Sequence, residues 1–90
     1  MYPNAPQNLT VSSVTDTSVS LVWDAVTVSG ATIEYEIYRD GQSVGMTGSE
    51  MFTDVGLMAG TSYDYYVIAV SSAGKQSQPS DVVTAITNEV

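Results

Sequence analysis

The chain has 90 residues, enough for one domain whose core hides about two-thirds of the unfolded surface. It carries 10 acidic residues against 2 basic ones, a formal net charge of -8, which excludes nucleic acid and anionic membrane as partners because both bind clustered Lys and Arg. The absence of Cys and His excludes a disulfide framework, thiol chemistry, zinc-thiolate sites and His-dependent catalysis.

The N-terminal residues predict an extended segment outside the sandwich proper. Pro3 and Pro6 favour extended backbone, both for themselves and for the residues before them. We therefore expect residues 1–5 to be the end of a linker and the domain to span residues 6–88. The segment lacks the charged and apolar regions of a signal peptide, so if the protein is exported we expect this chain to be part of a longer one.

Alternating apolar and polar residues predict the first two strands. Residues 8–14 form the first strand, with a bulge before its end, and residues 19–23 form the second. Trp23 faces inward on the second strand and is the largest candidate for the core. The loop after this strand contains two apolar residues, Val26 and Val28, that are unusual for a loop.

The next two strands are predicted to form a hairpin. Residues 33–38 alternate, and the chain returns through residues 43–47. Asp40 and Gly41 lie between them and predict a type I′ turn, in which both central residues need a positive φ. Phe52 is expected to point inward on the strand that comes next.

Residues 57–69 join a turn signal to the longest alternating stretch of the chain. The spacing of Leu57, Gly60 and Tyr63 resembles the tyrosine corner of Greek-key sandwiches, in which the phenol bonds to backbone a few residues upstream. A core-facing Tyr needs a partner for its hydroxyl group, and such a corner supplies one. The inward residues of the strand are expected to be Tyr63, Tyr65, Val67 and Ala69.

The C-terminal part predicts a polar loop over residues 71–79 and a last strand over residues 82–87. The alternation leaves two phases open for the inward residues of this strand: Val83, Ala85 and Thr87, or Val82, Thr84 and Ile86. No segment has the apolar period of a helix. Seven short strands at roughly ten-residue spacing predict an all-β, immunoglobulin-like Greek-key β-sandwich.

Taken together, these spacings resemble the fibronectin type III domain from Pro6 to Thr87. The matching positions are Pro6, Leu9, Val11, Val19, Leu21, Trp23, Tyr35, Ile37, Leu57, Gly60, Tyr63, Tyr65, Val67 and Ala69. The segments 35–41, 52–57 and 69–74 are similar to bacterial members, which occur in secreted glycoside hydrolases, surface proteins and phage virion proteins.

The resemblance implies a three-stranded ABE sheet packed on a four-stranded C′CFG sheet, with the termini at opposite ends. It favours Val83 and Ala85 as inward residues of the last strand. The family has no catalytic residues to carry over. The Arg-Gly-Asp tripeptide by which some animal members bind integrins is not carried over either, because the corresponding loop reads Ala73-Gly74-Lys75-Gln76.

Carboxylates are the remaining candidates for chemistry. Glu34 and Glu36 leave one face of a strand about 7 Å apart, a separation that glycosidase pairs use. The outer face of a small sandwich is open to water, so we interpret this pair as a solvated face and expect no catalytic residue. Asp40 and Asp54 precede glycines and are interpreted as turn formers; no metal site and no cofactor are expected.

The outward side of the C′CFG sheet is the candidate binding face. Tyr38, Tyr66, Ile68 and Glu36 are expected there, with the two tyrosines on neighbouring strands. Such rings can stack on sugars or dock a neighbouring domain. The alternative is that a cross-strand aromatic pair only stabilises the sheet.

These features favour a non-catalytic spacer or accessory module of a secreted or surface-exposed multidomain protein, not an enzyme. The alternatives are a carbohydrate- or protein-binding module that uses the candidate binding face, and a phage virion or surface-fibre component. Expected partners are neighbouring domains of the same chain, and polysaccharide or protein if the face binds. The isolated domain is expected to be a monomer. The residues expected to be structural are Trp23, Tyr63, Leu57 and Gly60.

Overall fold

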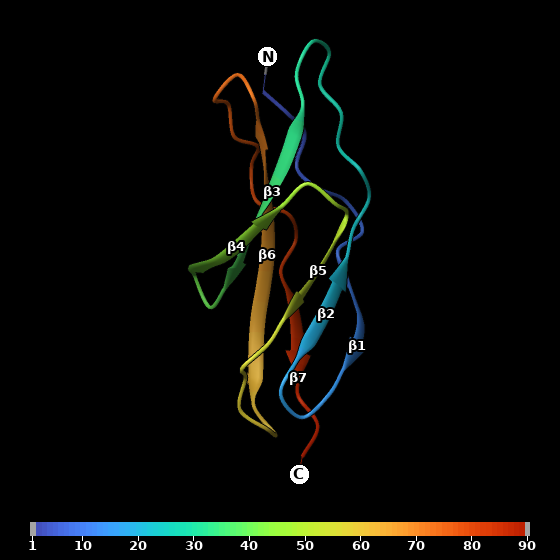
Figure 1. The fold of residues 1–90 in the computed structure, drawn as a ribbon, viewed down its shortest axis with the longest axis vertical. Helices are drawn as coiled ribbons and strands as arrows, with labels where there is room; N and C mark the ends of the chain where they lie inside the picture. The colour runs from blue at the N-terminus through green and yellow to red at the C-terminus, as the bar shows by residue number, and fades with distance from the viewer. Residues whose placement is uncertain (1, 90) are drawn as a thin grey trace.

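The computed structural model describes residues 2–89, and in this range seven strands form two antiparallel sheets packed face to face (Figure 1). The strands are β1 (Thr10–Val14), β2 (Val19–Val22), β3 (Ile33–Arg39), β4 (Gln42–Thr47), β5 (Met51–Asp54), β6 (Ser62–Ser71) and β7 (Val83–Ile86). One sheet has the order β1-β2-β5 and the other β4-β3-β6-β7. This arrangement confirms the predicted seven-stranded sandwich and its division into ABE and C′CFG sheets.

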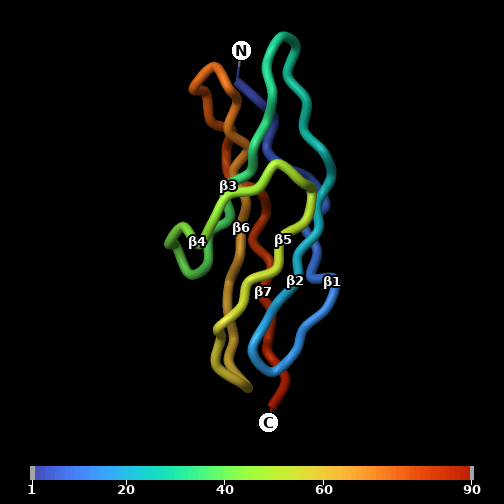
Figure 2. The backbone as a smooth tube through the Cα atoms, in the orientation of Figure 1, coloured from blue at the N-terminus to red at the C-terminus, as the bar shows by residue number. Residues whose placement is uncertain are grey.

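The molecule is elongated, with principal extents of 47 × 20 × 18 Å. The two ends of the described chain lie at opposite ends of the long axis (Figures 1 and 2). The expected boundary between a linker (residues 1–5) and the domain (residues 6–88) stays a prediction. Pro3 and Pro6, which lie on either side of it, are both buried. Within residues 2–89 no helix is long and apolar enough to cross a membrane.

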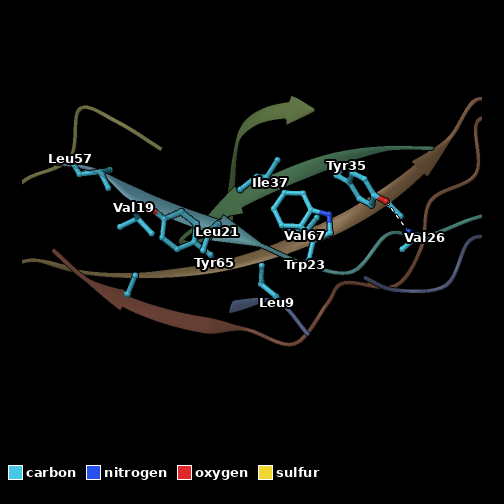
Figure 3. Packing of buried hydrophobic residues seen from close by; sticks show 12 residues of the cluster. Leu9, Val19, Leu21, Trp23, Val26, Tyr35, Ile37, Leu57, Tyr65 and Val67 are labelled. Carbon is cyan, nitrogen blue, oxygen red and sulfur yellow. Dashed lines mark hydrogen bonds between the residues drawn. The ribbon is translucent and has the colours of Figure 1, made fainter. Parts of the chain in front are cut away.

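The core lies between the two sheets (Figure 3). Its buried residues are Leu9, Val19, Leu21, Trp23, Val26, Tyr35, Ile37, Leu57, Tyr65, Val67, Ala69 and Ala85. Phe52 and Tyr63, which were expected to point inward, and Val11 are only partly buried and pack against this cluster. Val11 and Phe52 lie on β1 and β5, the two edge strands of the three-stranded sheet.

Val26, one of the two apolar residues of the loop after β2, is part of the core. Its side chain is 9% exposed. Its backbone N–H donates to the Tyr35 hydroxyl at 2.8 Å, as Figure 3 shows. The buried phenol thus obtains a partner, and the loop is fixed to β3 by a bond between residues nine apart.

The first strand is shorter than predicted because Asn8 has a φ of 58°, in the left-handed region, and cannot continue an extended strand. β1 begins at Thr10, and its pairing with β2 shifts register between Val11 and Ser13. The predicted bulge is therefore confirmed.

The hairpin between β3 and β4 confirms the predicted type I′ turn. Asp40 has a φ of 51° and Gly41 a φ of 85°. The backbone N–H of Asp40 donates to the Asp64 carbonyl at 2.8 Å, and the Asp40 carboxylate accepts the Asp64 N–H at 2.9 Å. The turn is thus tied to β6 as well as to its own hairpin.

Replacing Gly41 with Ala is expected to lower the free energy of unfolding by about 1 to 2 kcal/mol, since a side chain at a positive φ is strained. Nothing lies within 4 Å of the added Cβ, so the loss reports backbone strain alone. Gly48→Ala is the matched control, because Gly48 has equal space and no positive φ. Equal urea midpoints for the two variants would contradict the strain argument.

β7 resolves the phase that the sequence left open. Ala85 and Thr87 are 3% and 2% exposed, whereas Val82 and Ile86 are 60% and 63% exposed. Ala85 pairs with Tyr63 on the neighbouring strand and belongs to the core between the sheets. The phase that the resemblance favoured is therefore confirmed.

Candidate functional site

The outward side of the four-stranded sheet brings the candidate binding residues together. β3 pairs with β6 so that Tyr38 lies opposite Tyr66 and Glu36 opposite Ile68. The two phenol rings are stacked, with centroids 4.9 Å apart and planes 7° from parallel. All four side chains are half-buried. We call these four residues, together with Met46 described below, the outer face.

Glu36 is held by two hydroxyl groups. The Tyr38 hydroxyl donates to Oε1 at 3.1 Å, and the Ser43 hydroxyl donates to Oε2 at 2.7 Å. Burial raises the pKa of Tyr38, and the hydrogen bond to the Glu36 carboxylate raises it further. Both carboxylate oxygens are therefore engaged within the sheet, and the carboxylate orients the ring of Tyr38.

Met46 is a member of the outer face that the sequence did not indicate. It lies on β4 opposite Glu36 and is 49% exposed. Residues 43–47 show no clean alternation, because the β3–β4 pairing shifts register between Ile37 and Tyr38. That shift determines which β4 side chains point outward, and sequence periodicity gives no signal for it.

The geometry of the tyrosine pair limits what the outer face can bind. Each ring turns one face toward the other ring, so each has at most one face left for a ligand. A flat sugar-binding platform needs ring faces turned toward solvent. The surface of residues 2–89 also has no pocket, so a ligand on the outer face would stay largely in water.

The Glu34 and Glu36 carboxylates share the outward side of β3, as expected. Glu34 is exposed, and Glu36 is bound by Tyr38 and Ser43. Neither is enclosed with a space that could hold a sugar ring. In the described part of the chain, no three His, Cys, Asp or Glu side chains are grouped so that they could hold a metal ion.

A second polar cluster lies inside the sandwich, and it corrects the interpretation of Asp54 as a turn former. Asp54 ends β5 and is only 6% exposed. Its Oδ2 accepts Arg39 Nη1 at 2.6 Å and the Tyr65 hydroxyl at 2.8 Å. Because Asp54 belongs to one sheet and its two partners to the other, this cluster joins the sheets.

Arg39 covers one margin of this cluster. Its side chain is 31% exposed, and its guanidinium carbon lies 5.7 Å from the centroid of the Tyr63 ring. The charge thus reaches water while its stem and planar head cover buried groups. The arrangement satisfies the buried Asp54 carboxylate, which makes the cluster structural rather than reactive.

The Tyr65 phenol should make the domain sensitive to alkali. Burial raises its pKa above the ordinary value of 10.0, and so does its bond to the Asp54 carboxylate. The folded state then keeps a proton that the unfolded state releases, so stability is constant below about pH 10 and falls as the pH rises above it. Burial also raises the pKa of Tyr35, which adds to the fall.

We expect the urea midpoint to decrease from about pH 9 to about pH 11 in the wild type. The decrease should be smaller in Tyr65→Phe, which lacks the buried phenol but keeps part of the response through Tyr35. An equal decrease in both proteins would exclude Tyr65 as a source.

The predicted tyrosine corner links the start of β6 to other parts of the chain. The Tyr63 hydroxyl accepts the backbone N–H of Met58 at 2.9 Å, five residues upstream. Leu57 is 7% exposed, and its N–H donates to the Thr17 carbonyl at 2.9 Å. Gly60 has a φ of 59°, and its N–H donates to the Asn88 carbonyl at 3.1 Å. The corner thus joins β6 to two segments that are distant in the sequence.

Trp23 is 5% exposed and packs edge-on against Tyr35, with ring centroids 5.3 Å apart and planes at 67°. Its Nε1 is the one buried side-chain polar atom of residues 2–89 that lacks a hydrogen-bond partner. Its place is in the core, where Figure 3 shows it between the two sheets.

Comparison with known proteins places this geometry in a family. The sequence profile of the fibronectin type III domain matches residues 4–86. A poly(3-hydroxybutyrate) depolymerase of Ralstonia pickettii is 45% identical over 84 residues, which is 93% of this chain and 17% of that protein. Exoglucanase B of Cellulomonas fimi is 39% identical over 87 residues, 94% of this chain and 8% of that protein.

Solved structures agree with these matches. The chitinase ChiA74 from Bacillus thuringiensis contains a region with a TM-score of 0.86 and 33% identity, covering 97% of this chain and 14% of the chitinase. The chain thus spans less than a fifth of the length of each of these three enzymes. Its two sheets, its tyrosine corner and its sequence together make this chain a fibronectin type III domain of the kind found within multidomain bacterial hydrolases.

Proposed function

We propose that the chain is a non-catalytic spacer module that sets the distance between neighbouring modules of a larger protein. The observation that carries this proposal is the coverage: the relatives match nearly the whole of this chain but only 8% to 17% of their own lengths. A sandwich that is 47 Å long, with its ends at opposite poles, holds the module before it apart from the module after it.

The bonding of two carboxylates supports a non-catalytic role. The carboxylates of Glu36 and Asp54 are each held by two side-chain donors. A catalytic acid or base needs a free proton position and a bound substrate within hydrogen-bond reach. Both oxygens of Glu36 and Oδ2 of Asp54 instead accept hydrogen bonds within the fold.

The relatives' names support an extracellular location and partners within the same chain. A depolymerase, an exoglucanase and a chitinase are enzymes that act on polymers, and large polymers do not cross membranes. We propose that this domain likewise works outside the cell, beside a module with hydrolytic activity. Its charge of -8 favours solubility and mutual repulsion, which suits a domain that stays monomeric.

The competing function is carbohydrate binding through the outer face. It is favoured by the presence of Tyr38 and Tyr66 on one exposed sheet surface, and weakened by their stacking on each other. In this alternative one ring face and the neighbouring Met46 and Ile68 would contact a neutral sugar chain.

Titration of the isotope-labelled domain with cello-, chito- and xylo-oligosaccharides distinguishes the two functions. The spacer predicts no change of backbone amide shifts up to millimolar sugar. Saturable shifts around Tyr38 and Tyr66 would overturn it and establish a binding module. The double variant Tyr38→Ala/Tyr66→Ala must abolish such shifts, whereas Met58→Ala, at an exposed site in the corner, must preserve them.

A further inference from the structure

The N-terminal end of the sandwich is built from three segments that lie side by side: residues 2–6, the loop 24–32 and the turn 71–75 (Figures 1 and 2). The loop and the turn are joined by reciprocal hydrogen bonds. Ser72 N–H donates to the Thr32 carbonyl at 2.9 Å, and Thr32 N–H donates to the Ser72 hydroxyl at 3.1 Å. These two segments therefore form one fixed surface.

The turn holds the backbone of Lys75 in place. Ser71 N–H donates to the Lys75 carbonyl at 2.8 Å, and Gly74 N–H donates to the Ser71 carbonyl at 2.9 Å. Gly74 has a φ of 82°, which allows the chain to close this turn tightly. Lys75 is thus presented from a rigid base although its side chain is exposed.

Residues 2–6 are held by a charge contact to this surface and by the burial of two prolines. The Lys75 ammonium lies 5.2 Å from the centroid of the Tyr2 ring. Pro3 and Pro6 are both buried, and Pro6 is among the most completely buried side chains. Arg39, the other basic residue, is paired with Asp54, so Lys75 carries the positive charge available at this end.

We propose that residues 2–6 form a clamped strap, which fixes the orientation of a preceding module relative to the long axis of the domain. The proposal rests on the proposed spacer function and deepens it, since it makes the spacer set direction as well as distance. A free five-residue linker would span roughly 12 Å with no preferred direction. A strap held by Tyr2, Pro3 and Pro6 removes that freedom.

The charges at this end also indicate what kind of surface a preceding module would place against the strap. Tyr2 is 68% exposed, and one of its faces is covered by Lys75. A preceding module therefore meets an aromatic ring and an ammonium group at this end of a domain whose net charge is -8, which fits a module whose adjoining surface is neutral. A basic adjoining surface would compete with Lys75 for the ring.

Backbone relaxation of the isotope-labelled domain tests the strap directly. We expect amide order parameters of about 0.85 for Asn4 and Ala5, equal to those of the strands. Values below about 0.6 would show a free linker and overturn the proposal. The ring of Tyr2 should also shift the ε-methylene protons of Lys75 upfield, and this shift should vanish in Tyr2→Leu.

The variant Lys75→Met removes the charge and keeps the length of the side chain. An exposed cation–π contact shifts an equilibrium about two- to fivefold, so the ratio of clamped to free strap should fall by that factor, with lower order parameters at Asn4 and Ala5. Lys75→Arg should preserve the wild-type values. Unchanged order parameters in Lys75→Met would assign the clamp to the prolines alone and overturn the role of Lys75.

Spin labels provide an independent measurement, because the chain has no Cys and two labels can be placed selectively. In Asn4→Cys/Ser62→Cys, the strap predicts a narrow distance distribution, which broadens when Lys75→Met is added. A distribution as broad in the double-Cys protein as in urea would refute the clamp. Failure of the strap leaves the sugar titration unaffected, so it is distinguishable from failure of the spacer function.

Discussion

Trp23→Ala is expected to lower the free energy of unfolding by about 3 to 5 kcal/mol, which approaches the whole stability of a small domain. The side chain is 5% exposed and packs against Tyr35 in the centre of the core. Its removal leaves a cavity between two sheets that are each held by backbone hydrogen bonds and cannot collapse freely. Urea unfolding followed by far-ultraviolet circular dichroism measures the loss without relying on the deleted fluorophore.

Trp23→Phe is the matched control. Because Nε1 of Trp23 has no hydrogen-bond partner, this variant loses packing volume but no hydrogen bond. Its destabilisation should be clearly smaller than that of Trp23→Ala. A Trp23→Ala protein with the wild-type melting temperature would contradict the place of Trp23 in the core.

Asp54→Ala is expected to cost about 2 to 4 kcal/mol. The largest part comes from the Tyr65 hydroxyl, which would be left buried without an acceptor at a cost of about 1 to 3 kcal/mol. The rest comes from Arg39, whose ion pair is worth at most about 1 kcal/mol because the guanidinium is partly in water. The loss of a bond between the two sheets should appear as a lower urea midpoint with an unchanged slope.

Two variants separate the contributions to this cluster. Asp54→Asn keeps an oxygen that accepts the Tyr65 hydroxyl but loses the charge. It should therefore keep more than half of the stability that Asp54→Ala loses. Tyr65→Phe removes the hydroxyl and leaves Arg39 paired, with an expected cost of about 1 kcal/mol. If Asp54→Ala is no more destabilised than Tyr65→Phe, the ion pair and the orphaned hydroxyl contribute nothing measurable.

Local patterns in the sequence were sufficient for the architecture. Alternation over residues 33–38 predicts a strand because successive side chains point to opposite faces. Asp40 and Gly41 predict their turn because few other residues accept a positive φ at two successive positions. The position of Tyr63 relative to Gly60 likewise indicates the corner. Each signal depends only on neighbouring residues and on the stereochemistry of the backbone.

The candidate binding residues were predictable in position but not in geometry. Strand phase and strand neighbours are enough to place Tyr38 and Tyr66 on one side of the sheet. Their parallel stacking, and the engagement of Glu36 by two hydroxyl groups, depend on rotamers and register that periodicity does not encode. Those details weaken the case for sugar binding.

Contacts between distant parts of the chain came from the packing of the two sheets. Asp54 has the sequence context of a turn, but the sandwich buries it beside Arg39 and Tyr65, where its charge needs these donors. Val26 looks like a loop residue and becomes part of the core, where its backbone N–H is the partner of the Tyr35 hydroxyl.

The chain alone therefore specifies strands, turns and fold, through local stereochemistry and the period of two. Which polar groups meet, and which loop residues are buried, depends on how the sheets pack, because those partners lie far apart in the sequence and meet at a register that no local pattern sets.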